Sequence, residues 1–248
     1  MIKDDRGIVG NIKMVKLIDS LIEDGWLRTP RVIEAFQEIK RADFMPDDMK
    51  NLAELNEALP IGYGQTISQP LTVAFMLEQL QPEPANKILD IGSGSGWTSA
   101  LLAYIVSKEE LKSNIKKQKS KLNGKVIAIE IIPELKKFGE KNVAKYNFIK
   151  KGIVEFICAD GSKGYPNFAA RPEGVRPSSV EVLAEGFDKI LASAAAEEIP
   201  KAWKEQLKIG GRIVCPVKSS IFLLIKKSEI EFEKIEYPGF AFVPLIQK

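Results

Sequence analysis

The sequence predicts an α/β fold with a mostly parallel sheet and helices on both of its faces. Three observations support this prediction. From Lys87 onward, short apolar runs rich in β-branched residues alternate with helical segments, a pattern typical of a parallel sheet that is covered on both sides. A glycine-rich turn, GSGSG, joins the first apolar run to a helix. Two later runs, IFLLIKK and IEFEKIEY, predict an antiparallel hairpin at the sheet edge.

Composition sets the broad class of protein. A length of 248 residues corresponds to one large domain or to a domain with an appendage. Hydrophobic residues make up 45% and charged residues 28% of the chain, which excludes a disordered chain and a small disulfide scaffold. No stretch approaches the roughly 18 to 20 apolar residues that cross a bilayer. We therefore expect a soluble cytoplasmic protein with no membrane partner.

The first third of the chain predicts helices. An apolar stripe that begins at Ile12 ends near Gly25, as expected for an amphipathic helix. Thr29 and Pro30 predict an N-cap and a first-turn proline for a second helix. The segment PIGYGQTISQP, residues 60–70, contains too many prolines and glycines for a regular element. Its final proline opens another apolar helix, LTVAFMLEQL.

The remainder supplies the sheet. The expected strands are KILDI, VIAIE, VEFIC, FDKILAS and RIVCPV, and the expected helices are TSALLAYIV, one after Pro133 and one from about Glu197 to Lys208. Residues 108–124 and 166–186 have the composition of insertions. The first is lysine-rich and suggests either a nucleic-acid contact or a solvated segment. We favour the solvated segment, with no nucleic-acid partner, because the net charge is only +3 and no aromatic residue is interleaved.

The scarcity of histidine and cysteine limits the possible chemistry. The chain has no histidine, and its two cysteines, Cys158 and Cys215, lie inside apolar runs. We interpret both as buried strand residues rather than as a disulfide or redox pair. A zinc site and a Ser-His-Asp triad cannot be built from these residues. We expect no metal site.

The segment LDIGSGSGWTSALL predicts a ligand site. Asp90 is followed by Gly92, Gly94 and Gly96 and then by a helix, so the backbone can turn sharply and approach a ligand near free N–H groups. Trp97 stands where a dinucleotide fingerprint needs its third glycine. The carboxylate of Asp90 favours a positively charged ligand over a pyrophosphate. The alternative is a purely structural turn.

Two further acidic residues follow later strands. Glu130 ends VIAIE, where it can accept hydrogen bonds from the two hydroxyls of a ribose, and Asp160 follows VEFIC. Acidic residues at the ends of three successive parallel strands predict one crevice at the carboxyl edge of the sheet. Each of them could instead be a helix N-cap.

The order of these motifs resembles a known family. LDIGSGSGWTSA, VIAIE, ADG, FDKILASAAAEEIP and LKIGGRIVCPV resemble the class I S-adenosylmethionine-dependent methyltransferases. PIGYGQTISQP, PRVIEAFQEIKRADFMP and FVPLIQK narrow the resemblance to the protein-L-isoaspartate O-methyltransferases. It covers most of the chain apart from the two insertions and implies a Rossmann-like fold with an N-terminal helical extension.

The resemblance implies transfer of a methyl group from S-adenosyl-L-methionine to the free carboxylate of an L-isoaspartyl residue, with S-adenosyl-L-homocysteine as the second product. Its implied partners are peptides and proteins containing isoaspartyl residues. It implies that Ser68 is the catalytic and a substrate-binding residue. The other implied substrate-binding residues are Ala194, Ala195, Ala196, Val243, Pro244 and Leu245. The implied cofactor-binding residues are Gln65, Thr66, Ile67, Asp90, Gly92, Ser93, Gly94, Ser95, Glu130, Ile131, Asp160 and Gly161.

The reaction is chemically compatible with a chain that lacks histidine. A carboxylate with a pKa near 4 is already ionised at neutral pH, so it can attack a sulfonium methyl group without a general base. Our hypothesis is that the Ser68 hydroxyl orients this carboxylate. The alternative is that Ser68 only caps the helix at Pro70. The chain departs from the family pattern at Glu54 and Asn56, where relatives commonly have tyrosine and aspartate, and at Tyr63, where many have histidine.

Two other functions stay open at this point. One is a methyltransferase of the same fold that acts on another nucleophile, since fold does not fix function. The other is a catalytically inactive relative that binds the cofactor. We expect a monomer in which residues 1–80, a helical segment with the active-site loop, pack on an S-adenosylmethionine-binding core of residues 81–248 as one structural unit.

Overall fold

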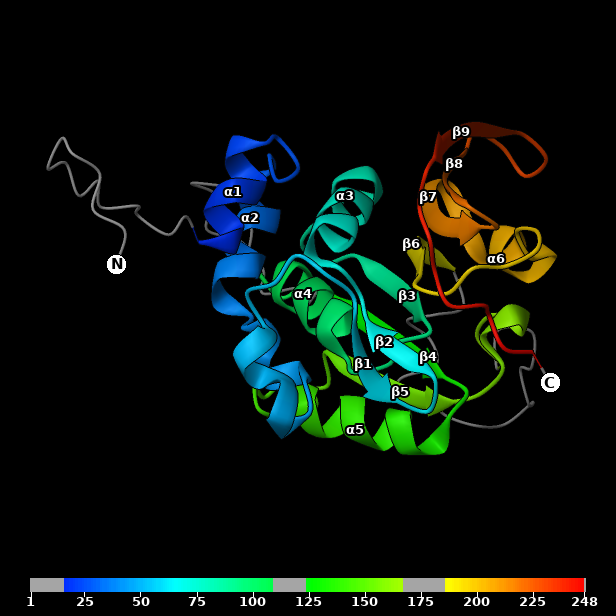
Figure 1. Cartoon of the computed structure of the whole chain (residues 1–248). Helices are drawn as coiled ribbons and strands as arrows, with labels where there is room; N and C mark the ends of the chain where they lie inside the picture. The colour runs from blue at the N-terminus through cyan, green and yellow to red at the C-terminus, as the bar shows by residue number, and fades with distance from the viewer. Residues whose placement is uncertain (1–15, 109–123, 167–185, 248) are drawn as a thin grey trace, which may run out of the picture.

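The computed structural model describes residues 16–108, 124–166 and 186–247 (Figure 1). Most of both expected insertions and the start of the helix expected from residue 12 lie outside these ranges. Within the described part of the chain, no helix is both long and apolar enough to cross a membrane.

A seven-stranded sheet forms the centre of the molecule, in the order β5-β4-β3-β6-β7-β8-β9. The strands β3 to β7 run parallel to one another, and β8 is antiparallel to both of its neighbours. This arrangement confirms the predicted parallel sheet with an antiparallel edge. The strands are β3 (Lys87–Ile91), β4 (Lys125–Glu130), β5 (Val154–Cys158), β6 (Phe187–Ala192), β7 (Leu207–Val217), β8 (Ser220–Lys226) and β9 (Phe232–Pro238).

Helices cover both faces of the sheet because apolar side chains alternate along its strands. In β3, Ile88 packs with α2 to α5 in one hydrophobic cluster, whereas Leu89 and Ile91 pack with Trp203 of α6 in another. Figure 1 shows α1 and α2 at one end of the molecule and α6 with β7 to β9 at the other. The helices of the described part of the chain are α1 (Leu17–Glu23), α2 (Pro30–Glu38), α3 (Pro70–Leu80), α4 (Trp97–Val106), α5 (Pro133–Ala144) and α6 (Lys201–Gln206), with the short 3-10 helices η1 (Arg41–Phe44), η2 (Asp47–Leu52) and η3 (Gly161–Lys163).

The connections around β3 create a topological switch point. From β3 the chain continues through β4 to β5 on one side and then crosses to β6 on the other side of β3. A crevice opens outside the carboxyl ends of the strands at such a point, and ligands of open α/β sheets bind there.

The N-terminal helices and the sheet share one hydrophobic core. The cluster that contains Ile88 also contains Leu21 of α1 and Leu223 of β8. The division of the chain at residue 80 stays a prediction.

Two local expectations were wrong and two others were confirmed only in part. Residues 60–70 were expected to be irregular, but β1 (Leu59–Gly62) and β2 (Gln65–Ile67) form an antiparallel hairpin. Its two-residue turn has positive φ at both Tyr63 (55°) and Gly64 (71°). Positive φ at both positions is typical of a type I′ turn, which matches the twist of the two strands. The glycines therefore close a hairpin instead of preventing one.

The other three expectations that differ from the structure concern the ends of helices and strands. Thr29 and Pro30 occupy the predicted N-cap and first-turn positions of α2, but the Thr29 side chain makes no capping hydrogen bond, because its hydroxyl donates to Glu78 Oε2 over 2.6 Å. Helix α6 begins only at Lys201, after Pro200, and ends at Gln206, where β7 starts. Cys158 is exposed rather than buried, because it is the last residue of the edge strand β5. Cys215 is buried as expected.

Candidate active site

A cleft that encloses about 720 Å³, including space open to solvent, lies at the carboxyl edge of β3, β4 and β6. Its walls come from six parts of the chain, namely β2 with Ser68, the glycine turn after β3, the end of β4, the loop after β5, the residues after β6 and the C-terminal segment. Fifteen predicted site residues line it: Gln65, Thr66, Ile67, Ser68, Gly92, Ser93, Gly94, Ser95, Glu130, Ile131, Gly161, Ala194, Val243, Pro244 and Leu245. Asp90, Asp160, Ala195 and Ala196 are outside this lining.

The glycine turn forms the floor of the cleft. Gly92 and Gly94 have φ values of 72° and 50°, a region that side-chain-bearing residues rarely adopt. Behind the turn, a Cβ on Gly96 would lie 2.8 Å from the carbonyl oxygen of Gly139 in α5. Glycine is therefore needed both for the curvature of the turn and for the close approach of α5.

Glu130 joins the floor to the neighbouring wall. Its side chain is 5% exposed, and its two oxygens accept hydrogen bonds from backbone N–H groups. Gly94 N donates to Oε2 over 2.8 Å, and Ile132 N donates to Oε1 over 3.0 Å. Each carboxylate oxygen can accept more than one hydrogen bond, so Glu130 is held in place and still has acceptor capacity for a ligand in the cleft.

Asp90 lies behind the glycine turn and is fully buried. Its Oδ2 accepts from Ser99 Oγ over 2.6 Å and from Thr98 Oγ1 over 3.1 Å, while Oδ1 has no partner among the described residues. Burial raises the pKa of Asp90 to about 6, although the hydrogen bonds from Ser99 and Thr98 oppose the rise. Asp90 thus anchors the start of α4 and does not form the wall of the cleft.

Asp160 caps a short helix, which is the alternative role that the sequence analysis gave for the acidic residues after the strands. Its Oδ1 accepts from Ser162 N over 3.0 Å and from Ser162 Oγ over 2.7 Å, which makes it the N-cap of η3. The adjacent Gly161 does line the cleft. A Cβ there would lie 2.4 Å from Ile91 Cγ2, so glycine lets this loop pack directly on the end of β3.

Ser68 follows β2 and faces the cleft with a partly exposed side chain. Its hydroxyl forms no hydrogen bond with any residue that the structure describes. The alternative role of Ser68 as the cap of α3 is absent from this structure. The free N–H of Leu71 in the first turn of α3 donates instead to Asn56 Oδ1 over 2.9 Å. Asn56, a departure from the family pattern, therefore caps α3 from a distant loop.

The C-terminal segment reaches the cleft by pairing with the residues after β6. Ala195 N donates to Val243 O over 2.8 Å, and Leu245 N donates to Ala195 O over 2.8 Å. Ala194 and the segment 243–245 therefore form adjoining parts of the wall. Ala196 pairs away from the cleft, with Val217 of β7. The roles of Ala195 and Ala196 in binding substrate stay predictions.

Sequence reasoning missed one donor in the cleft, Trp97, and did not predict that a second, Ser93, lacks a partner. Ser93 was predicted only by its place in the motif, and Trp97 was treated as a departure from the dinucleotide pattern. Both line the cleft, at 4% and 3% exposure. The hydroxyl oxygen of Ser93 and the indole nitrogen of Trp97 have no partner among the described residues. Buried donors are normally satisfied, so a ligand that accepts hydrogen bonds fits this floor.

A polar small-molecule cofactor fits these residues. The glycine turn admits close approach of a ligand, Glu130 offers acceptors suited to ribose hydroxyls, and two buried donors lack partners. The mostly parallel sheet, the antiparallel edge strands and the cleft at the carboxyl edge of β3 define a Rossmann-like fold of the class I methyltransferase type.

Comparisons with known proteins identify the family. The family model described as "Protein-L-isoaspartate(D-aspartate) O-methyltransferase (PCMT)" matches residues 12–248. The chain belongs to this family. A protein-L-isoaspartate O-methyltransferase of Methanopyrus kandleri is 36% identical over 235 residues, covering 93% of this chain and 90% of the relative. The corresponding protein of Staphylothermus marinus is 37% identical over 235 residues, covering 93% and 92%.

Solved structures agree on the fold. A beta-aspartate methyltransferase (PCMT) from Plasmodium falciparum, solved in complex with S-adenosyl-L-homocysteine, superposes with a TM-score of 0.73 at 22% sequence identity. The superposition covers 94% of this chain and 97% of that protein. A further protein-L-isoaspartate O-methyltransferase structure superposes with a TM-score of 0.70 at 23% identity and covers 92% of this chain.

Proposed function

We propose that this chain is a protein-L-isoaspartate O-methyltransferase, an S-adenosylmethionine-dependent carboxyl O-methyltransferase that starts the repair of damaged proteins. The observation that carries the proposal is the presence of Ser68 on the same cleft as the glycine turn and Glu130. The Ser68 hydroxyl, which would orient the acceptor carboxylate, thus faces a site that fits an adenosyl cofactor. Membership of the family supports the choice of an isoaspartyl carboxylate as the acceptor.

The cofactor would be held by the floor of the cleft. Glu130 would accept hydrogen bonds from the ribose hydroxyls, while Ser93 and Trp97 would donate to polar atoms of the amino-acid part. When bound, the sulfonium supplies the methyl group and S-adenosyl-L-homocysteine remains. The chain itself has to exclude water and to hold the two reactants in line, since orientation of this kind can lower a barrier by several kcal/mol.

The acceptor needs orientation more than activation. Its carboxylate is ionised at neutral pH, so no proton has to be removed before it attacks. The Ser68 hydroxyl would donate a hydrogen bond to one carboxylate oxygen and leave the other free to react. Ala194 and residues 243–245, which form the neighbouring wall, would lie along the peptide backbone on either side of the reacting residue.

The partners follow from the same chemistry. We infer that the protein binds isoaspartyl-containing peptides and proteins, works in the cytoplasm as a monomer, and does not bind nucleic acid. The net charge of +3 supports the last point because nucleic-acid-binding domains usually carry a strongly basic surface. Scattered exposed apolar side chains, such as Ile209 and Ile230, do not indicate a large apolar interface.

The function is tested by a matched pair of peptides that differ only in an L-isoaspartyl or a normal aspartyl linkage. Purified protein is incubated with each peptide and with S-adenosylmethionine labelled on the methyl group. We expect label on the isoaspartyl peptide alone, released as methanol by mild base. Equal labelling of the two peptides would indicate another methyltransferase activity, and cofactor binding without transfer would indicate an inactive relative.

The role of Ser68 is tested in the same assay. Ser68→Ala removes the hydroxyl that would orient the acceptor, so we expect kcat to fall about 100-fold. The affinity for S-adenosyl-L-homocysteine should change less than about threefold. Ser20→Ala, which removes a hydroxyl of α1 outside the cleft lining, serves as the control. Unchanged turnover of Ser68→Ala would reject the role.

A further inference from the structure

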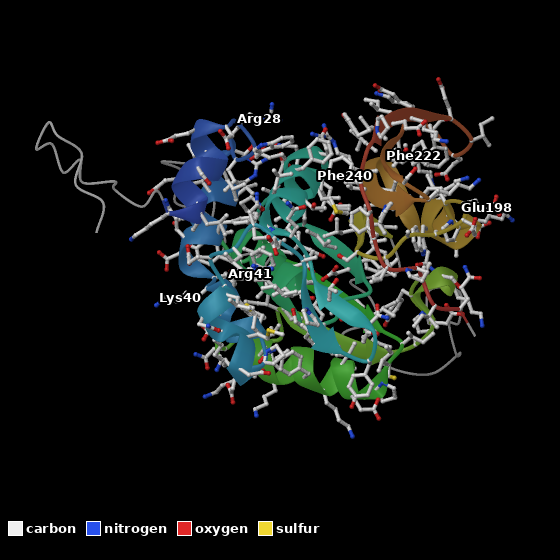
Figure 2. All side chains as sticks on the ribbon, in the orientation of Figure 1. Arg28, Lys40, Arg41, Glu198, Phe222 and Phe240 are labelled. Atoms are coloured by element: carbon white, nitrogen blue, oxygen red, sulfur yellow. The ribbon has the colours of Figure 1, made fainter. Side chains whose placement is uncertain are left out.

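Arg41 is a buried cation that sequence reasoning did not select. It opens η1, its side chain points into the protein, and the residue is 7% exposed, whereas the adjacent Lys40 is exposed (Figure 2). Arg41 forms no ion pair with a described residue. Burial lowers its pKa to about 10, and the more distant charge of Glu54 opposes this shift only in part. A buried charge is costly unless other polar groups compensate it.

Main-chain carbonyl groups compensate Nη1 and Nη2, whereas the buried Nε has no hydrogen-bond partner among the described residues. Nη1 donates to Ala53 O over 3.1 Å and to Leu55 O over 2.9 Å. Nη2 donates to Glu57 O over 2.7 Å and to Ser68 O over 3.2 Å. One planar guanidinium group therefore ties the loop of residues 53–57 to the residue that carries the acceptor-binding hydroxyl.

The same guanidinium group also contacts the cofactor side of the cleft. Its carbon atom Cζ lies 5.5 Å from the ring centroid of Trp97, within the range of a cation–π contact. Trp97 lines the cleft. Arg41 is thus placed between the floor of the cleft and residues 65–68, called the serine loop from here on. A transfer reaction must keep these two parts aligned.

A second link supports the serine loop from the same direction. Asn56 O accepts a hydrogen bond from Gln69 Nε2 over 2.9 Å, and Asn56 Oδ1 accepts from Leu71 N. Residues on both sides of Pro70 are therefore fixed to the 53–57 loop. That loop has no regular secondary structure between η2 and β1, so its position depends on these bonds and on Arg41.

We propose that Arg41 is a positioning residue for the methyl transfer, which holds Ser68 in register with the floor of the cofactor cleft through its bonds to the 53–57 loop and to Ser68 O. The proposal rests on the proposed function. Arg41 touches neither reactant. Its loss should slow transfer without a matching loss of cofactor affinity.

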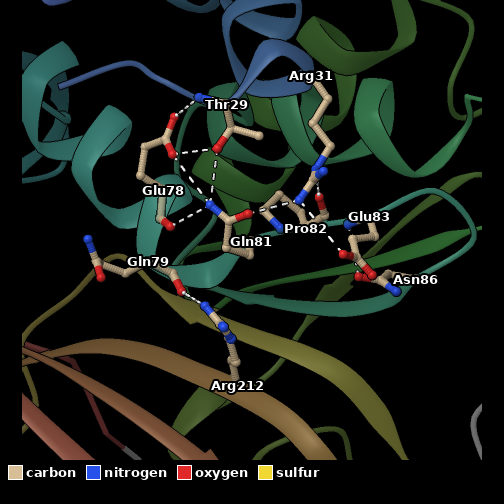
Figure 3. Close-up of polar contacts among 9 residues, drawn as sticks. All are labelled: Thr29, Arg31, Glu78, Gln79, Gln81, Pro82, Glu83, Asn86 and Arg212. Atoms are coloured by element: carbon tan, nitrogen blue, oxygen red, sulfur yellow. Dashed lines mark hydrogen bonds and ion pairs between the residues drawn. The ribbon is translucent and has the colours of Figure 1, made fainter. Parts of the chain in front are cut away.

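The test uses Arg41→Lys and Arg41→Met beside a matched control, Arg31→Lys. Arg31 also donates to a main-chain carbonyl, with 2.6 Å from Nε to Pro82 O, and to Gln81 Oε1, but these contacts lie outside the cleft (Figure 3). Lysine keeps the buried charge, so Arg41→Lys should fold. Its single ammonium group cannot reproduce the planar fork that reaches four carbonyls.

We expect Arg41→Lys to lower kcat for the isoaspartyl peptide about 10- to 100-fold, as for a displacement of roughly 1 Å at a reacting group. Arg41→Met should lower it further. The affinity for S-adenosyl-L-homocysteine, measured by calorimetry, should change less than about threefold in Arg41→Lys. Arg31→Lys should keep both values. An unchanged kcat in Arg41→Lys, equal losses of kcat and cofactor affinity, or failure of both Arg41 variants to fold would overturn the proposal.

A measurement that needs no substrate separates this proposal from the proposed function. Amide hydrogen exchange of residues 53–57 and 65–68 should be at least 10-fold faster in Arg41→Lys than in the wild-type protein, while exchange in β3 and β4 should be unchanged. If the wild-type protein methylates no isoaspartyl peptide, the proposed function fails and the exchange result still tests the link. If exchange in Arg41→Lys is faster throughout the protein, or is no faster than in the wild type at residues 53–57 and 65–68, Arg41 does not position the serine loop.

Discussion

Two carboxylates near the glycine turn differ in how their oxygens are satisfied. Both oxygens of Glu130 accept backbone N–H groups. Asp90 is completely enclosed, and its Oδ1 has no partner among the described residues. Burial without full hydrogen bonding disfavours the charged form, which is why the pKa of Asp90 rises to about 6. The ionised Asp90 therefore reduces stability at neutral pH.

Replacing Asp90 with asparagine should change how stability depends on pH. The wild-type carboxyl group has a folded pKa of about 6 against an ordinary value of 3.8, so the native state binds more protons than the unfolded state between these values. Stability thus falls as pH rises through this window, and the full loss is present above about pH 6. The difference corresponds to roughly 3 kcal/mol. Asp90→Asn should lose this pH dependence.

The measurement is urea unfolding of both proteins at pH 4, 5, 6 and 7. The free energy of unfolding of Asp90→Asn relative to wild type should increase from pH 4 to pH 7. Ser20→Ala, which removes a hydroxyl that donates to the main-chain carbonyl of Leu17, should follow the wild-type curve with a constant offset. Parallel curves for Asp90→Asn and wild type would contradict a raised pKa.

At the scale of elements, the glycine turn depends on a helix that is distant from it in sequence. A Cβ on Gly139 of α5 would lie 2.7 Å from Gly94 O and 3.2 Å from Gly96 N. Gly94 N also donates to Glu130. The packing of α5 on the turn is therefore linked directly to the position of the residue that would bind the ribose.

Gly139→Ala should be destabilising although alanine favours helices. Higher helix propensity adds about 1 kcal/mol, but overpacking against backbone atoms costs about 1–3 kcal/mol, and the turn cannot move without breaking the bond to Glu130. We expect a net loss of about 1–2 kcal/mol and a severalfold weaker affinity for S-adenosyl-L-homocysteine, measured by thermal unfolding and calorimetry. Lys137→Ala, at an exposed position of α5, should change stability by less than about 0.5 kcal/mol. Normal affinity in Gly139→Ala would contradict the link.

For the whole molecule, the strands and the cleft could be predicted because their patterns are local. The alternation around β3 to β7 fixes a parallel sheet, and Glu130 ends its strand on the expected edge. Contacts between distant segments could not be predicted. The Thr29 hydroxyl donates to Glu78 rather than capping α2, and Asn56 Oδ1 accepts from Leu71 N in α3. Among the described residues, the hydrogen bonds of Arg41 go to main-chain carbonyls, which no side-chain motif encodes.

The central claim is that one cleft at the carboxyl edge of the sheet brings a sulfonium cofactor and Ser68 together. The most direct measurement is a crystal structure of the protein with S-adenosyl-L-homocysteine and an isoaspartyl peptide. The account predicts the ribose on Glu130, the amino-acid part on Ser93 and Trp97, and the Ser68 hydroxyl on the peptide carboxylate beside the sulfur atom. A cofactor bound elsewhere, or a serine hydroxyl turned away from the sulfur atom, would contradict it.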